Sequence, residues 1–185
     1  MKNPHIKKSV NVEYIRRYVH LTLTGQFQMF GSLPPRLVCF NQENVTSMIS
    51  QHLPDAAARE QFVSDFQLLC IAEGALAAAC MVEVWMSPPD AQGLRPSEHT
   101  DRREFVIVNI ELPDGKGEVN LYPIIREGDA KPRLGQFQTF LRQSVQGILS
   151  GFLPEKTPTE SHRIIAATLL QRTGRVLHQF PLPNI

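Results

Sequence analysis

Apolar and polar residues alternate through the middle of the chain, between residues 77 and 126. The alternation falls in three segments, residues 78–86, 103–112 and 118–126, and the middle one is rich in β-branched residues, which favour strands. The Pro113-Asp114-Gly115-Lys116 stretch is typical of a hairpin turn. We therefore predict an antiparallel β-meander of three or four strands, with residues 133–141 as either the fourth strand or the start of a helix.

Apolar residues spaced three or four apart predict helices before the meander. Residues 12–23 have this spacing and predict an N-terminal amphipathic helix that ends near Gly25. Asn41 and Asp55 each stand where a helix N-cap is expected, and Gly74 stands where the second of these helices would end. The pattern predicts an αα-hairpin over residues 41–74, preceded by a short strand or buried connector at 37–40.

A helical pattern returns after the meander. Residues 145–152 predict a short helix, and Thr157-Pro158-Thr159-Glu160 has the arrangement of a capping box that begins a helix reaching Arg172. The packed face of that helix is predicted from its apolar spacing as Ile164, Ile165, Thr168 and Leu169. Residues 175–180 alternate like a terminal strand.

These elements predict an α+β fold in which the antiparallel meander packs against an N-terminal αα-hairpin and a C-terminal helix. The chain has 185 residues, of which 42% are hydrophobic and 20% charged, values that suit a globular domain and argue against disorder or a coiled coil. We predict a single domain over residues 1–185. It consists of an N-terminal helix and connector (1–40), the αα-hairpin (41–74), the meander (75–141) and C-terminal helices with a tail (142–185).

The register of the hairpin decides which side chains share a face of the meander. Pairing Leu112 with Gly117 collects an aliphatic core face, which consists of Val106, Val108, Ile110, Leu112, Val119, Leu121 and Ile125. The opposite, mixed face then holds Arg103, Phe105, Ile107, Asn109, Glu111, Glu118, Asn120, Tyr122 and Ile124, joined by Glu83 and Trp85 if Val82 and Val84 belong to the core face. A slip that set Asn120 opposite Ile110 would bury an amide. We therefore predict the Leu112–Gly117 register.

Aromatic and polar side chains on the mixed face form the candidate ligand or partner site. Its residues are Trp85, Arg103, Phe105, Asn109, Asn120 and Tyr122. Aromatic rings beside a few polar groups are typical of a small-molecule or peptide site, and equally of a sheet face covered by a helix or a second subunit. A sheet edge is a further natural pairing surface. We predict an accessory or interaction protein that binds itself, as a homo-oligomer, or another protein.

Catalytic chemistry has fewer candidates. Phosphate-binding loops, nucleophile elbows, paired-cysteine zinc motifs and HExxH helices are absent from the sequence. A polar cluster over residues 97–104 contains His99 and Asp101, which together with Glu83 could serve a metal-dependent or acid/base hydrolase. The competing interpretation is a solvated loop with salt bridges. We predict no cofactor and no metal.

The net charge of +1 hides an uneven distribution. Basic residues exceed acidic ones by five over residues 1–40 and by four over 119–185, whereas acidic residues exceed basic ones by eight over 41–118. The basic ends leave weak nucleic-acid binding as a second alternative, although no nucleic-acid-binding motif accompanies them. The sequence has neither a secretory signal nor a membrane-spanning pattern, so we expect a cytoplasmic protein. Its cysteines are expected to be reduced core thiols: Cys39, Cys70 and Cys80.

Overall fold

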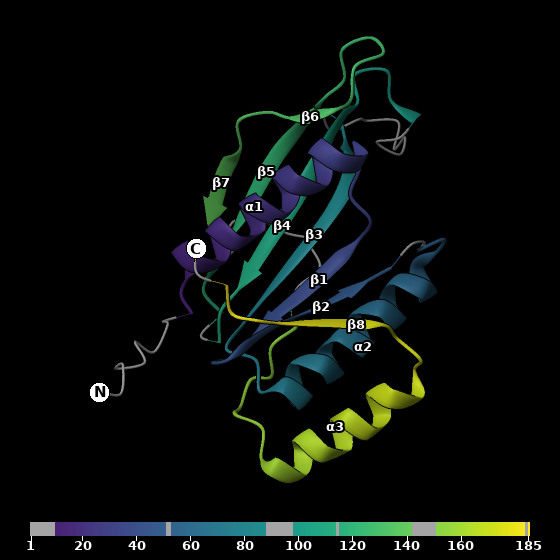
Figure 1. Cartoon of the computed structure of the whole chain (residues 1–185). Coiled ribbons are helices and arrows are strands. Elements are labelled where there is room, and N and C mark those ends of the chain that lie inside the picture. Colours follow the sequence, from purple (N-terminus) through teal and green to yellow (C-terminus); the bar gives the residue numbers. More distant parts are fainter. Residues whose placement is uncertain (1–9, 51–52, 88–97, 114, 142–150, 184) are drawn as a thin grey trace, which may run out of the picture.

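The computed structural model describes residues 10–50, 53–87, 98–113, 115–141, 151–183 and 185. Within these residues the chain forms three helices and an eight-stranded antiparallel sheet (Figure 1). The helices are α1 (Val12–Phe30), α2 (Ala56–Glu73) and α3 (Glu160–Arg172). The strands are β1 (Arg36–Phe40), β2 (Asn44–Ile49), β3 (Ala77–Met86), β4 (Arg103–Glu111), β5 (Gly117–Ile125), β6 (Arg133–Leu134), β7 (Gln138–Leu141) and β8 (Leu177–Pro181). The α+β class is confirmed, and the sheet is larger than the predicted meander.

The predicted meander forms one half of the sheet. The strand order is β6-β5-β4-β3-β1-β2-β8, with β7 also paired to β5, so β3, β4 and β5 are neighbours, as the alternation predicts. Residues 133–141 contain the strands β6 and β7, which decides the open question there in favour of strand. The terminal strand is also confirmed, because β8 closes the other edge of the sheet.

The first helix of the predicted αα-hairpin is wrong, because residues 44–49 form strand β2. Val45 pairs with Phe40 in a β1–β2 hairpin, and the Asn41 side chain accepts the backbone N–H groups of Glu43 and Asn44 at 2.9 and 2.7 Å. Asn41 therefore turns the chain between two strands instead of capping a helix. Over so short a segment, the apolar spacing fits the repeat of a helix as well as that of a strand. Pairing with β1 decides in favour of the strand.

The second helix of that hairpin is confirmed, and α1 is longer than predicted. The Asp55 side chain accepts the N–H of Ala58 at 2.8 Å, and α2 ends at Gly74 in the left-handed conformation. Helix α1 continues through Gly25 to end at Gly31, where φ is 69°. Burying Phe27 adds another apolar turn to the core, which outweighs the ~1 kcal/mol penalty of a glycine within a helix.

The predicted register of the β4–β5 hairpin is wrong by one residue, because Glu111, and not Leu112, lies opposite Gly117. The Leu112 N–H donates to the Lys116 carbonyl at 2.9 Å, so the turn is tighter than the four-residue loop we expected. Gly117 has a φ of 151°, and a Cβ there would lie 2.0 Å from the carbonyl oxygen of Ile110. Only glycine fits this close approach.

Helices cover both faces of the sheet. Apolar side chains are therefore buried on both faces, and not on a single aliphatic face as we predicted. We call the two sides the α1 face and the α2 face. On the α1 face the core consists mainly of Ile15, Val19, Leu23 and Phe27 from the helix and Val38, Ala79, Met81, Val106, Val108 and Ile110 from the strands. On the α2 face it consists mainly of Phe62, Phe66, Leu69 and Cys70 from the helix and Leu37, Cys39, Met48, Ala78 and Cys80 from the strands. All three cysteines are free and buried, as predicted.

Helix α3 packs against α2 at the lower end of the molecule in Figure 1, with a different face from the one predicted. Its N-cap is Thr159, whose hydroxyl accepts the N–H of His162, so the capping box begins two residues after Thr157. Ala166 and Leu170 are the buried residues of the helix. The apolar residues we expected to be packed are exposed: Ile164, Ile165 and Leu169. The small Ala166 side chain lets the other face approach α2 closely. The predicted helix at 145–152 lies mostly outside the described residues.

Candidate partner-binding groove

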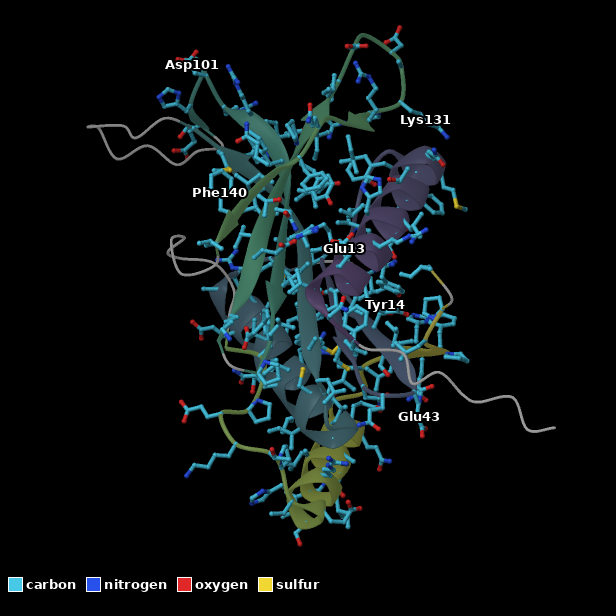
Figure 2. The ribbon with its side chains drawn as sticks, turned by 90° about the vertical axis from the view of Figure 1, so that its left-hand side faces the viewer. Glu13, Tyr14, Glu43, Asp101, Lys131 and Phe140 are labelled. Carbon is cyan, nitrogen blue, oxygen red and sulfur yellow. The ribbon has the colours of Figure 1, made fainter. Side chains whose placement is uncertain are left out.

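A groove of about 680 Å³ lies at the end of the β3–β4–β5 meander that is farthest from α2 and α3. We call it the Trp85 groove. Its lining residues are Trp85, Arg102, Arg103, Glu104, Phe105, Leu121, Pro123, Ile124, Ile125, Arg126 and Gln138. In Figure 2, Asp101 marks this end of the sheet, and Phe140 of β7 lies on the side away from α1.

The floor of the groove is apolar and half-buried. Phe105 of β4 lies opposite Pro123 of β5, and Leu121 of β5 lies opposite Gln138 of β7. The core of the α2 face does not extend this far, so these side chains are only partly covered by the described residues. Further coverage would stabilise them by roughly 25 cal/mol per Å² of apolar surface removed from water.

The rim of the groove combines an aromatic ring with positive charge. Trp85 is 41% exposed, and the guanidinium carbon of Arg102 lies 4.7 Å from the centre of its ring. This cation–π contact holds both side chains at the rim. Arg126 forms an ion pair with Glu104, while Arg103 is exposed. The lining thus contains three arginines and one glutamate.

Three residues of the predicted partner face line the groove, namely Trp85, Arg103 and Phe105. Asn120 and Tyr122 lie on the α1 face, because the one-residue change in register moves β5 side chains to the other face, whereas Asn109 shares the face of Phe105 but lies farther along β4. Tyr122 packs on the α1 face, with its ring 4.9 Å from that of Phe137. Asn109 and Asn120 are buried. The six residues therefore do not share one surface.

Asn120 belongs to a buried polar network that fastens α1 to the meander. Its amide donates to Glu118 at 2.8 Å, and the Thr139 hydroxyl donates to its carbonyl oxygen at 2.6 Å. Arg16 of α1 donates to both carboxylate oxygens of Glu118, at 2.9 and 2.6 Å. Burial alone would raise the pKa of Glu118, but the hydrogen bonds from Arg16 and Asn120 outweigh it, so the net pKa is lowered. This network stabilises the fold and is closed to a partner.

The catalytic candidates are not brought together by any contact that the structure shows. The Nδ1 atom of His99 accepts the N–H of Asp101 at 3.2 Å, which is a bond within a single turn. Glu83 instead accepts the N–H of Leu33 at 2.5 Å. Burial is the main cause that raises the pKa of Glu83, although this N–H and the charge of Arg126 oppose it. Among the described residues, no three His, Cys, Asp or Glu side chains are grouped to hold a metal.

Most of the groove's lining was not predicted from the sequence. The residues we missed are Arg102, Glu104, Leu121, Pro123, Ile124, Ile125, Arg126 and Gln138. A signal existed for the first two, because Arg102 and Glu104 belong to the polar cluster at residues 97–104 and the meander places this cluster beside Trp85. The β5 residues needed the correct register, and Gln138 needed the β5–β7 pairing.

Comparisons with known proteins do not place the chain in a family. No family model matches it, and neither the curated proteins nor the solved structures contain a significant match. Within the described part of the chain, no helix is both long and apolar enough to cross a membrane.

Proposed function

We propose that this protein is an interaction module whose Trp85 groove binds a partner segment carrying acidic and apolar side chains. The observation that carries the proposal is the position of the chain's single tryptophan at the rim of the groove, 41% exposed beside an apolar floor. A large aromatic ring in such a position gains free energy when a partner covers it, and tryptophan is enriched among the residues that dominate binding energy.

The charge of the groove favours an acidic partner. Arg126 already pairs with Glu104 and Arg102 stacks on Trp85, so the proposal relies mainly on the exposed Arg103, in a lining that holds three arginines and one glutamate. Aspartate or glutamate on the partner would complement these guanidinium groups, whereas lysine or arginine would be repelled. Arginine also accepts planar carboxylates in a two-pronged geometry, which adds orientation to the attraction.

Recognition in this groove depends on side chains. The floor strand β4 is paired with β3 and β5, and β5 is paired with β4 on one side and with β6 and β7 on the other. At the floor, Phe105 is paired with Val84 and Pro123, and Leu121 is paired with Ile107 and Gln138, so a partner would not bind to these two residues as an added strand. Binding should depend on the partner's sequence and should weaken with salt.

Tryptophan fluorescence provides the test, because Trp85 is the only tryptophan in the chain and reports on this groove alone. The probes are short synthetic peptides that alternate glutamate with leucine and phenylalanine, and matched peptides with lysine in place of glutamate. We expect the acidic peptides to change the emission of Trp85 in a saturable way and the lysine peptides to have no effect. Arg103→Glu should weaken binding at least about tenfold.

Arg17→Glu is the matched control, since Arg17 is an exposed arginine of α1 that does not line the groove. It should leave the affinity for the acidic peptides unchanged. Equal binding of acidic and lysine peptides, no binding of either, or an equal loss of affinity in the two variants would each contradict the proposal.

A further inference from the structure

We infer that this chain forms a two-fold symmetric dimer in which β8 pairs antiparallel with β8 of a second copy. The strand order of the sheet ends at β8, and no described residue pairs with its outer side. This edge lies at the opposite end of the sheet from the Trp85 groove (Figure 1). The inference is therefore independent of the proposed function.

Hydrogen bonds determine which backbone groups of this region point outward. The Leu182 N–H donates to the Glu43 carbonyl at 2.9 Å, in the same register that pairs β8 with β2. Bonding direction alternates along an antiparallel strand, so residues 178 and 180 also bond to β2. Leu177, Gln179 and Pro181 consequently direct their backbone groups away from the sheet.

These outward groups are self-complementary about Gln179. With the two-fold axis beside this residue, each Gln179 N–H can donate to the Gln179 carbonyl of the other copy, and each Leu177 N–H to the Pro181 carbonyl. Pro181 has no N–H, but it stands at the outward position, where this lack leaves its bonding to β2 intact. It also limits the ladder to a few residues, so side chains must contribute to the interface.

Side chains on the α1 face support the same register. Phe180 would lie directly opposite His178 of the second copy, at the distance where cross-strand side chains touch. In the single chain, Phe180 pairs with Val45 of β2 and is 54% exposed. Pairing would place it between two strands and remove much of that surface from water.

Exposed apolar side chains of α3 and β8 would add to the buried area of the dimer. Six apolar side chains of α3, β8 and the preceding residue are between 37% and 67% exposed: Ile164, Ile165, Leu169, Val176, Leu177 and Phe180. If each contributes on the order of 100 Å², they present roughly 600 Å² per copy. With the strand backbone added, this approaches the roughly 800 Å² per partner that a stable interface buries.

Substitution of Gln179 provides the test, measured by light scattering during size-exclusion chromatography at about 100 µM protein. The wild-type chain should elute at twice its mass of 20.9 kDa. Gln179→Pro removes an outward N–H that is used only between copies, and should give a monomer with an unchanged circular dichroism spectrum. Gln179→Ala loses the same side-chain hydrogen bond to Glu73 but keeps the N–H, and should remain a dimer.

A second pair of variants keeps the test decisive if Gln179→Pro fails to fold. Phe180→Lys places charge at the paired edge and should weaken the dimer at least about tenfold. Phe30→Lys changes an equally exposed phenylalanine at the end of α1 and should leave the dimer intact. A monomeric wild-type chain overturns the inference, and so does a dimer that persists in both Gln179→Pro and Phe180→Lys.

Discussion

The two ends of the sheet expose apolar side chains in different settings. At the groove end, Trp85 and Phe105 line a concave surface together with arginines, and the floor residues Phe105 and Leu121 are paired on both sides. At the opposite end, Phe180 lies on β8, whose outer edge no described residue pairs with, and is 54% exposed. Exposed apolar area is therefore common to both ends, and the two proposals differ in what surrounds it. The arginines of the groove support the proposed acidic partner, whereas a strand edge that no described residue pairs with supports the inferred second copy.

In each half of the molecule, a buried carboxylate is hydrogen-bonded to an arginine in a distant part of the chain. Glu118 and Arg16 fasten α1 to β5 in the meander. Asp65 of α2 accepts a hydrogen bond at 2.7 Å from Arg175, which follows α3 and precedes β8. Because these pairs hold different elements, breaking one should affect one end and spare the other.

The largest effect is expected from Arg175→Ala. Asp65 is 1% exposed and would keep only the hydrogen bond from Gln61, while the contact between Arg175 and the Phe62 ring would also be lost. Leaving a buried carboxylate without its cation should lower the free energy of unfolding by about 3 kcal/mol, measured by urea titration. The dimer should weaken as well, because β8 follows directly.

Arg172→Ala is the control for this variant, since Arg172 is an exposed arginine in the last turn of α3, three residues before Arg175. It should change the free energy of unfolding by less than about 0.5 kcal/mol. If Arg175→Ala also abolishes peptide binding in the Trp85 groove while the chain remains folded, the two ends of the sheet are not held independently.

A smaller, pH-dependent effect is expected from Glu118→Gln. The pKa of Glu118 is lowered in the folded protein, so its stabilisation is fully present above the unfolded pKa of about 4.3 and is lost as the pH falls through the folded pKa. Glutamine replaces charge-assisted hydrogen bonds with neutral ones, so the free energy of unfolding at pH 7 should fall by about 1–2 kcal/mol. Urea titrations between pH 7 and acid measure both effects.

The variant and the wild type should converge in stability as the pH is lowered, because protonation removes the advantage of the carboxylate. A constant difference between them at every pH would show that Glu118 acts only through packing. The dimer should be unaffected, since this pair lies on the groove half of the sheet.

Strong local signals made half of the fold predictable from the sequence. Asp55 and Gly74 delimit α2 by capping chemistry alone, and the alternation in β4 is visible without any neighbour. Strand β2 was missed because the positions of Val45 and Met48 fit a helix as well as a strand. Only pairing with β1 across a tight turn, and with β8, which is distant in sequence, distinguishes the two.

The candidate site was half predictable for a related reason. Trp85 and Phe105 belong to a hairpin whose alternation places them near each other at one end of the sheet, whatever the β4–β5 register is. Their assignment to one face was wrong, because Trp85 lies opposite Glu104, whereas Val84 lies opposite Phe105. Tyr122 was assigned to the face of Phe105 through a β4–β5 register wrong by one residue, which depends on the geometry of a single turn. The exposure of Ile165 on α3 depends on which face α2 covers, a matter of tertiary packing.

The smallest effect is expected from Arg102→Ala, which removes the cation stacked on Trp85. A cation–π contact at an exposed site contributes about 0.5–1 kcal/mol, so losing this contact should lower the free energy of unfolding by about that amount. The emission of Trp85 should change, because its ring loses a charged neighbour, and acidic peptides should bind more weakly than to the wild type. The dimer should keep its mass in light scattering. If the affinity for these peptides is unchanged while the emission shifts, Arg102 only shields the ring, and the charge that selects the partner must come from Arg103.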